Sequence, residues 1–143
     1  MIVLDTDVVS ELMRTEPHAA VLRWVDSQAT DRLYITAITV AGLFYGVTRL
    51  ADGKRKRELA GIVEAVVEED FAERVVAFDD VAARRYADIA AGRERSGRPI
   101  SGPDAQIAAI CRSHAATVAT RNVGDFTDTG VAVVNPWELQ PPA

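Results

Sequence analysis

The chain has 143 residues, of which 48% are hydrophobic and 26% charged, and its formal net charge is −5. This balance is typical of one globular domain and excludes a disordered chain. The negative charge argues against bulk electrostatic binding to nucleic acid, although a local basic surface is compatible with it. The single cysteine, Cys111, excludes an internal disulfide, and with only His18 and His114 beside it a structural zinc site is not expected.

No charged leader followed by an apolar segment precedes the opening residues MIVLD, and no apolar run approaches the length that spans a bilayer. We therefore expect a cytoplasmic protein with no membrane partner. No internal repeat, low-complexity segment or linker divides the chain, so residues 1–143 are predicted to form a single domain.

Short apolar runs alternate with helical patterns from one end of the chain to the other. The apolar runs predict strands at residues 1–4, 33–35, 75–78, 116–119 and 131–134. The helical patterns predict helices from about Val8 after an Asp7 cap, at 17–27, after a Thr36 cap, at 54–70, from Asp79 or Asp80 to Arg95, and at 103–114. Strands that alternate with helices predict an α/β fold with a central parallel sheet sandwiched by helices.

Acidic and amide side chains follow two of the predicted strands, where parallel sheets place their ligand crevices. Asp5 and Asp7 follow the first strand, Asn122 and Asp125 follow the fourth, and Asp104 lies in the first turn of a helix. If these segments converge, their carboxylates require a counter-charge, and Mg²⁺ or Mn²⁺ favours such oxygen ligands and can activate water for phosphodiester cleavage. On spacing alone, Asp5 and Asp104 are equally well explained as helix caps.

Other chemistries have little support in this sequence. No GxGxxG follows a strand, and DGKRK lacks the first glycine and the Ser or Thr of a phosphate-binding P-loop. The spacing pairs no serine with a histidine as a hydrolase triad would require. A receiver domain needs a lysine after a late strand, whereas the lysines here are Lys54 and Lys56.

Gly42 is an unexpected residue in the middle of a predicted helix, because glycine there costs roughly 1 kcal/mol relative to alanine. One interpretation pairs Gly42 with Gly46 as small residues that let another helix approach closely. The segments around Gly42 indicate a second interpretation.

Five segments carry a resemblance to a known family: MIVLDTDVVSELMR, YITAITVAGLFYGVTRL, RPISGPDAQIAA, ATRNVGDF and VVNPWE. With these, the chain resembles a PIN-domain ribonuclease, and more closely a VapC-type toxin of the FitB-like subgroup, over essentially its whole length. The resemblance implies RNA cleavage with Mg²⁺ or Mn²⁺, a homodimer, and a VapB-type antitoxin whose C-terminal segment covers the active-site groove.

The resemblance also assigns the site residue by residue. The first metal-binding acid of the family falls on Asp5, the third on Asp104, and the last acidic cluster on Asn122 and Asp125. Asp5, Asp104 and Asp125 are thus the implied direct or water-mediated metal ligands, with Asn122 orienting a ligand or a water. Thr6 and Thr120 match small hydroxyl residues that line the site.

The chain departs from the family at the second acid, because the residue expected to be glutamate is Gly42. Asp7 is a smaller departure, since many relatives have asparagine there. A lost glutamate has two possible origins: natural drift to reduced activity, or a substitution selected or introduced because the active toxin harms its host.

Two hypotheses for the function follow. The first is a metal-dependent endoribonuclease toxin, impaired at position 42, and the second is a catalytically weak or silent binding module that dimerises and captures its antitoxin. Five arginines near the site in sequence are further candidates for contacts with RNA phosphates or the antitoxin. They are Arg84, Arg85, Arg93, Arg95 and Arg98.

Overall fold

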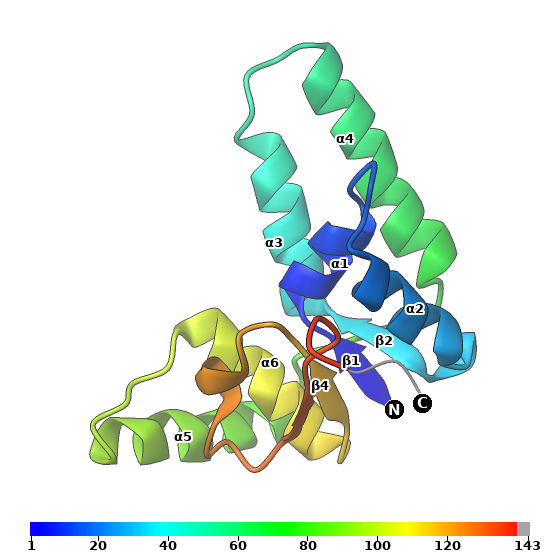
Figure 1. Ribbon diagram of the computed structural model, residues 1–143. Helices are drawn as coiled ribbons and strands as arrows, with labels where there is room; N and C mark the ends of the chain where they lie inside the picture. Colours follow the sequence, from blue (N-terminus) through cyan, green and yellow to red (C-terminus); the bar gives the residue numbers. More distant parts are fainter. Residues whose placement is uncertain (140–143) are drawn as a thin grey trace.

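A five-stranded parallel sheet forms the centre of the computed structural model, which describes residues 1–139 (Figure 1). The strands lie in the order β3-β2-β1-β4-β5. They are β1 (Ile2–Leu4), β2 (Leu33–Thr36), β3 (Val75–Val76), β4 (Thr117–Ala119) and β5 (Ala132–Val134). The predicted parallel α/β sheet is confirmed, although β3 at the edge of the sheet is shorter than the predicted strand at 75–78.

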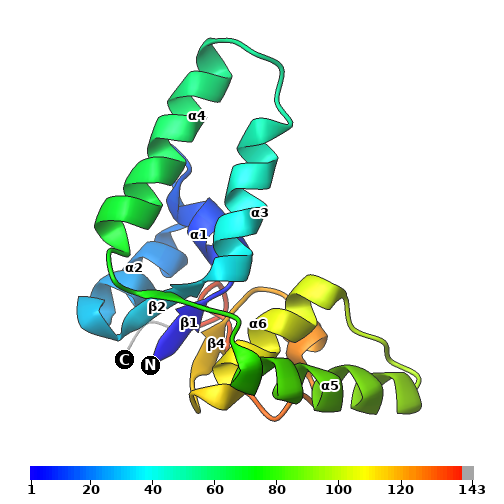
Figure 2. The same ribbon diagram turned by 180° about the vertical axis from the view of Figure 1, so that it is seen from behind.

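Helices cover both faces of this sheet. They are α1 (Thr6–Leu12), α2 (Ala19–Ser27), α3 (Ala37–Thr48), α4 (Lys54–Ala65), α5 (Asp80–Arg95) and α6 (Gly102–Ser113), with a π-helical turn η2 (Val66–Asp70) and 3₁₀ turns η1 (Thr30–Arg32) and η3 (Val123–Phe126). The predicted helix at 54–70 thus ends as a π turn. Helices α3 and α4 project together away from the sheet, while α5 and α6 lie on its other side (Figures 1 and 2). None of the helices within residues 1–139 has the length and apolar character needed to cross a membrane.

The central strand β1 divides the hydrophobic core in two. Ile2 and Leu4 pack with buried residues of α1 to α4, whereas Val3 packs with α5 and α6, for example in the cluster that contains Ile110. This alternation follows from the two-residue period of a strand. Both faces of β1 are buried, so the strand itself contains only apolar residues. The first polar residues, Asp5, Thr6 and Asp7, lie directly beyond its carboxyl end.

The start of α1 differs from the prediction in a way that matters for the site. The N-cap is Asp5, which spacing also allowed as a cap, and not Asp7: the Thr6 backbone N–H donates to Asp5 Oδ1 at 2.8 Å. The Asp5 N–H still donates to Ala119 O at 2.9 Å, which continues the pairing of β1 with β4 and leaves Asp5 in the extended conformation of a cap. The helix therefore begins directly where the strand ladder ends.

The other helix starts follow ordinary capping chemistry. Thr36 caps α3 as predicted, and its hydroxyl accepts from the Thr39 N–H at 3.1 Å. Ser101 caps α6 by accepting from the Asp104 N–H at 3.2 Å, so Asp104 itself is not the cap. Pro17 precedes the helix rather than opening it, because α2 begins at Ala19 after an N-cap at His18.

Gly42 lies on the exposed side of α3, away from the buried Leu43 and Val47. A Cβ atom placed on Gly42 would meet only Thr6 Cγ2, at 3.9 Å, and one on Gly46 would meet nothing within 4 Å. No neighbouring helix in the described chain therefore requires these glycines, and the interpretation as a close-packing pair is wrong within this chain.

Gly42→Ala should raise the free energy of unfolding by about 1 kcal/mol, because alanine lowers the conformational entropy of the unfolded chain and finds space here. Chemical denaturation measures the change. Gly97→Ala is the contrasting control: Gly97 has φ 75°, where a side chain is strained, so this variant should lose about 1 kcal/mol. A destabilised Gly42→Ala would show that the space above Gly42 is needed for packing.

Candidate active site

One cavity at the carboxyl ends of the strands, of about 630 Å³, gathers most of the residues singled out from the sequence. They come from the β1–α1 junction, α1, α3, α6 and the segment after β4, and they are Asp5, Thr6, Asp7, Gly42, Asp104 and Asn122. The structure therefore brings together acids that are far apart in the chain. Thr120 lies buried behind Asp5, and Asp125 is not part of the cavity wall.

Asp5 is the buried carboxylate of this cavity, with 6% of its surface exposed. Its two oxygens accept from different donors: Oδ1 from the Thr6 N–H and Oδ2 from the Thr120 hydroxyl, each at 2.8 Å. Burial, and then the charge of Asp7, raise the pKa of Asp5 to about 6, although both hydrogen bonds favour the ionised form. The site thus holds Asp5 firmly while disfavouring its charge.

Asp7 is held by the segment that follows β4. Its Oδ2 accepts from the Arg121 backbone N–H at 2.9 Å, with the Asn122 side-chain amide and the Thr120 hydroxyl farther away at 3.4 Å each. Its Oδ1 is buried and has no hydrogen-bond partner among residues 1–139. Burial raises the pKa of Asp7. A buried carboxylate oxygen without a partner is a place that a proton or a cation would satisfy.

Asp104 and Asp125 form the other half of the acidic environment. Asp104 lies in the first turn of α6, where burial raises its pKa, and the charge of Asp125 raises it further. Asp125 reaches this environment from η3 as an exposed residue. The two carboxylates therefore influence each other although only Asp104 lines the cavity.

Several wall residues escaped the sequence analysis. Ser10 and Tyr45 line the cavity, and each lies one helical turn from a predicted site residue, Thr6 and Gly42 respectively. The helical period could have found both. Gln106 also lines the wall, but no spacing or motif marked it.

The donor atoms in this cavity are of the type that a hard divalent cation binds, but too few of them are grouped together to hold one. Carboxylate and amide oxygens are the ligands that Mg²⁺ and Mn²⁺ prefer. Within residues 1–139, however, no three His, Cys, Asp or Glu side chains are grouped so as to hold an ion. Gly42 lies in the wall of the same cavity and contributes no side-chain donor to it.

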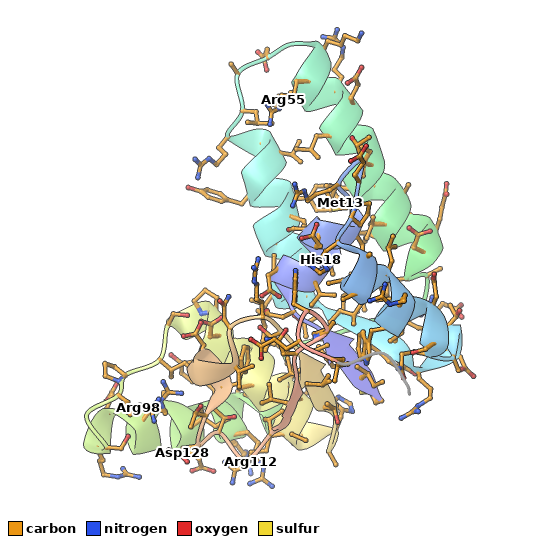
Figure 3. The ribbon with its side chains drawn as sticks, in the orientation of Figure 1. Met13, His18, Arg55, Arg98, Arg112 and Asp128 are labelled. Atoms are coloured by element: carbon orange, nitrogen blue, oxygen red, sulfur yellow. The ribbon has the colours of Figure 1, made fainter. Side chains whose placement is uncertain are left out.

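A second, mainly apolar cavity of about 360 Å³ adjoins the first between α1, α3 and α4. Leu43, Val47 and Leu59 are among its lining residues, and it shares Thr6, Ser10 and Gly42 with the acidic cavity. Two other lining residues, Met13 and Arg55, lie along the projecting pair of α3 and α4 (Figure 3). The acidic cavity therefore opens toward a surface suited to apolar side chains.

The arginines of α5 and the following loop divide into two groups. Arg84, Arg85, Arg95 and Arg98 are exposed, so they remain candidates for contacts with RNA or a partner. Arg93 is buried, with 6% of its surface exposed, and the expectation that it contacts RNA or the antitoxin is wrong. Its guanidinium binds backbone carbonyls of the protein instead.

The raised pKa of Asp5 predicts how stability depends on pH in buffer without divalent ions. Since folded Asp5 binds its proton more tightly than the unfolded chain does, the free energy of unfolding should fall as the pH rises from about 4 to about 6. Above pH 6, the free energy of unfolding should be lower than at pH 4 by roughly 2–3 kcal/mol because of Asp5. Asp5→Asn should remove the share of Asp5 and leave a smaller slope from Asp7 and Asp104, whose pKa values are also raised, as measured by chemical denaturation at a series of pH values.

Asp52→Asn is the matched control, because the Asp52 side chain is 99% exposed and its surface pair with Lys56 contributes little, so the slope between pH 4 and 6 should stay unchanged. An Asp5→Asn variant that keeps the slope of the parent chain between pH 4 and 6 would contradict the assignment of that slope to Asp5.

Comparison with known proteins agrees with this geometry. The PIN domain family matches residues 2–131. The VapC ribonuclease Y4jK of Sinorhizobium fredii is 44% identical over 138 residues, which cover 96% of this chain and 99% of that relative. The toxin FitB of Neisseria gonorrhoeae is 42% identical over 137 residues, with the same coverage.

Solved structures give the same result. A FitAB complex bound to a DNA fragment contains a chain that superposes with a TM-score of 0.90 at 41% identity, covering 99% of each chain. A FitAcB complex from Neisseria gonorrhoeae matches with a TM-score of 0.87 at 41% identity, covering 97% of this chain and all of that one. The chain described here belongs to the PIN-domain family, within its group of VapC and FitB toxins.

Proposed function

We propose that this chain is the toxin of a VapBC-type toxin–antitoxin pair, a Mg²⁺- or Mn²⁺-dependent endoribonuclease whose own activity is impaired at Gly42. The observation that carries the proposal is the acidic cavity, in which Asp5, Asp104 and Asn122 converge and Gly42 offers no side chain. Relatives named as a VapC ribonuclease and a FitB toxin support the reaction class. Such a toxin acts on cellular RNA in the cytoplasm.

The protein residues have separate roles in this proposal. Asp5 and Asp104 would hold the ion from the cavity wall, and Asp125, which does not line the wall, would act on it through water. Thr120 and Thr6 hold the Asp5 carboxylate by hydrogen bonds, so its orientation is fixed before any ion arrives. When bound, the ion would lower the pKa of a water and stabilise the charge that develops at the phosphate.

An antitoxin is the partner that this surface suits. Structural neighbours are complexes described as FitAB and, from Salmonella typhimurium, DNA-bound VapBC. The apolar cavity between α1, α3 and α4 would take apolar side chains of the antitoxin's C-terminal segment, which then passes over the acidic cavity. The toxin is expected to act as a homodimer.

A second function, a silent binding module, is favoured by one specific observation. No three acidic, histidine or cysteine side chains within residues 1–139 are grouped to hold an ion, whereas the apolar cavity is intact. A chain of this kind would dimerise and capture its antitoxin without cutting RNA. Cleavage by the chain itself distinguishes the two functions.

Gly42→Glu should restore tight metal binding and RNA cleavage. The new side chain has space, since a Cβ atom on Gly42 meets only Thr6 Cγ2 at 3.9 Å, and Thr6 itself lines the acidic cavity. A direct ligand should change Mn²⁺ affinity by more than the roughly 10–100-fold typical of an outer-shell partner. Calorimetric titration with Mn²⁺ and cleavage of a labelled RNA measure both effects, and Gly42→Ala is the control for helix stabilisation alone.

Two results would contradict the proposal in different ways. Equal and robust metal-dependent cleavage by the Gly42 and Gly42→Glu chains would show that position 42 is not a vacated ligand site. If neither chain cleaves RNA and the Gly42→Glu chain binds no Mn²⁺, the nuclease assignment itself fails.

Asp104→Asn tests the placement of the ligands independently. In the Gly42→Glu chain it should weaken Mn²⁺ binding by roughly tenfold or more, because a neutral amide replaces a charged oxygen donor. An unchanged titration would mean that the ion lies elsewhere. Asp88→Asn, on the exposed side of α5, is the matched control for the loss of one negative charge.

A further inference from the structure

Arg93 is a buried cation in the last turn of α5, and no other Lys or Arg within residues 1–139 is buried. Charged side chains are seldom buried unless their donors find partners. The partners of Arg93 are backbone carbonyl oxygens, not a carboxylate. Hydrogen bonds from Arg93 to backbone carbonyls indicate that this side chain holds chain segments in place.

The guanidinium of Arg93 bridges two segments that are distant in sequence. Its Nε donates to Arg98 O at 2.6 Å, and its Nη1 donates to Asp125 O at 3.0 Å and Thr127 O at 2.9 Å. The planar guanidinium of an arginine points its N–H donors in several fixed directions, so it can bind several carbonyl oxygens at once. A lysine ammonium on a flexible side chain does this less well.

A weaker contact, which does not involve Arg93, joins the same two segments. Arg98 Nη1 lies 3.9 Å from Asp128 Oδ2, and both side chains are largely exposed (Figure 3). Such a surface pair contributes little by itself. The buried guanidinium of Arg93 is therefore the main connection between the segments.

Both bridged segments lead to proposed site residues. The loop that contains Arg98 continues to Ser101, which caps α6 and so fixes the turn that carries Asp104. The other segment is η3 and its C-terminal flank, where Arg93 holds the carbonyl of Asp125 itself. Arg93 thus links the segment that leads to the Asp104 turn with the segment that carries Asp125, in addition to the packing of Phe126 of η3 in the core cluster that includes residues of α6.

We propose that Arg93 is a positioning residue, which fixes the Asp104 turn and the Asp125 turn relative to each other through their backbone carbonyls. This inference rests on the proposed function, because positioning matters to catalysis only if these acids serve the reaction. Arg93 touches neither RNA nor the ion. It acts through the two segments that it joins.

Arg93→Lys is the main test, because lysine keeps the positive charge but lacks the planar set of guanidinium donors. Arg93→Met removes both the charge and the donors. In the chain itself, hydrogen exchange at residues 97–101 and 122–128 should rise about tenfold, while exchange in β1 and β4 stays unchanged. In the Gly42→Glu chain, the same substitution should lower kcat for RNA cleavage about tenfold or more and leave KM within about twofold. Arg23→Lys, at an exposed position of α2 that lines neither the acidic nor the apolar cavity, should change neither quantity.

The proposal is overturned if Arg93→Lys leaves exchange in both segments unchanged, or if kcat is unchanged while exchange rises. It is also overturned if exchange rises uniformly over the whole chain and kcat falls only with the folded fraction, because Arg93 would then stabilise the fold and nothing more. If Arg93→Met fails to fold, Arg93→Lys still decides. A Gly42→Glu chain that is silent toward RNA would overturn the proposed function, whereas the exchange measurement would still decide whether Arg93 joins the two segments.

Discussion

The pairing of β1 with β4 is the constraint on which the site depends. Both strands are buried on both faces, and their parallel register places Leu4 opposite Ala119. The ladder extends one bond further, from the Asp5 N–H to Ala119 O, so that Asp5 and Thr120 emerge side by side. The Thr120 hydroxyl then holds the Asp5 carboxylate at 2.8 Å. An acid is thereby fixed at the edge of an apolar core, and the neighbouring elements bring further acids to it.

The clustered acids that suit the site for binding a cation also lower the stability of the fold, because their ionised forms are buried and lie close together. Burial raises the pKa of Asp5, Asp7 and Asp104, and the charges of neighbouring carboxylates raise the pKa of Asp5 and Asp104 further, so the site favours protons or a cation. Gly42 lowers the number of acids that the fold must accommodate, and no packing contact depends on it. Under the proposed function, a chain that lacks a glutamate at position 42 keeps the scaffold and the adjoining apolar cavity, so catalysis and partner capture would be separated by one residue.

Much of the fold could be predicted from the sequence because it depends on local periodicity. Alternating apolar runs and helical patterns predicted the parallel sheet, and the rule that ligands bind at the carboxyl ends of strands directed attention to Asp5 and Asn122. Spacing allowed both Asp5 and Asp7 as the cap of the first helix but could not decide between them, because the outcome depends on the hydrogen bond to Ala119 in another strand. The burial of Arg93 was missed for a similar reason: its partners are carbonyls contributed by loops far along the chain. The significance of Gly42 came from the family resemblance, since spacing alone offers only a glycine in a helix.

Anomalous diffraction from crystals soaked in Mn²⁺ tests the central claim most directly, namely that Gly42 occupies the place of a missing metal ligand. At the same Mn²⁺ concentration, crystals of the Gly42→Glu chain should show an ion between Asp5, Asp104 and the introduced carboxylate. Crystals of the parent chain should show little or no occupancy there. A fully occupied ion at this place in the parent chain, or an ion in the variant that does not touch the introduced carboxylate, would contradict the account.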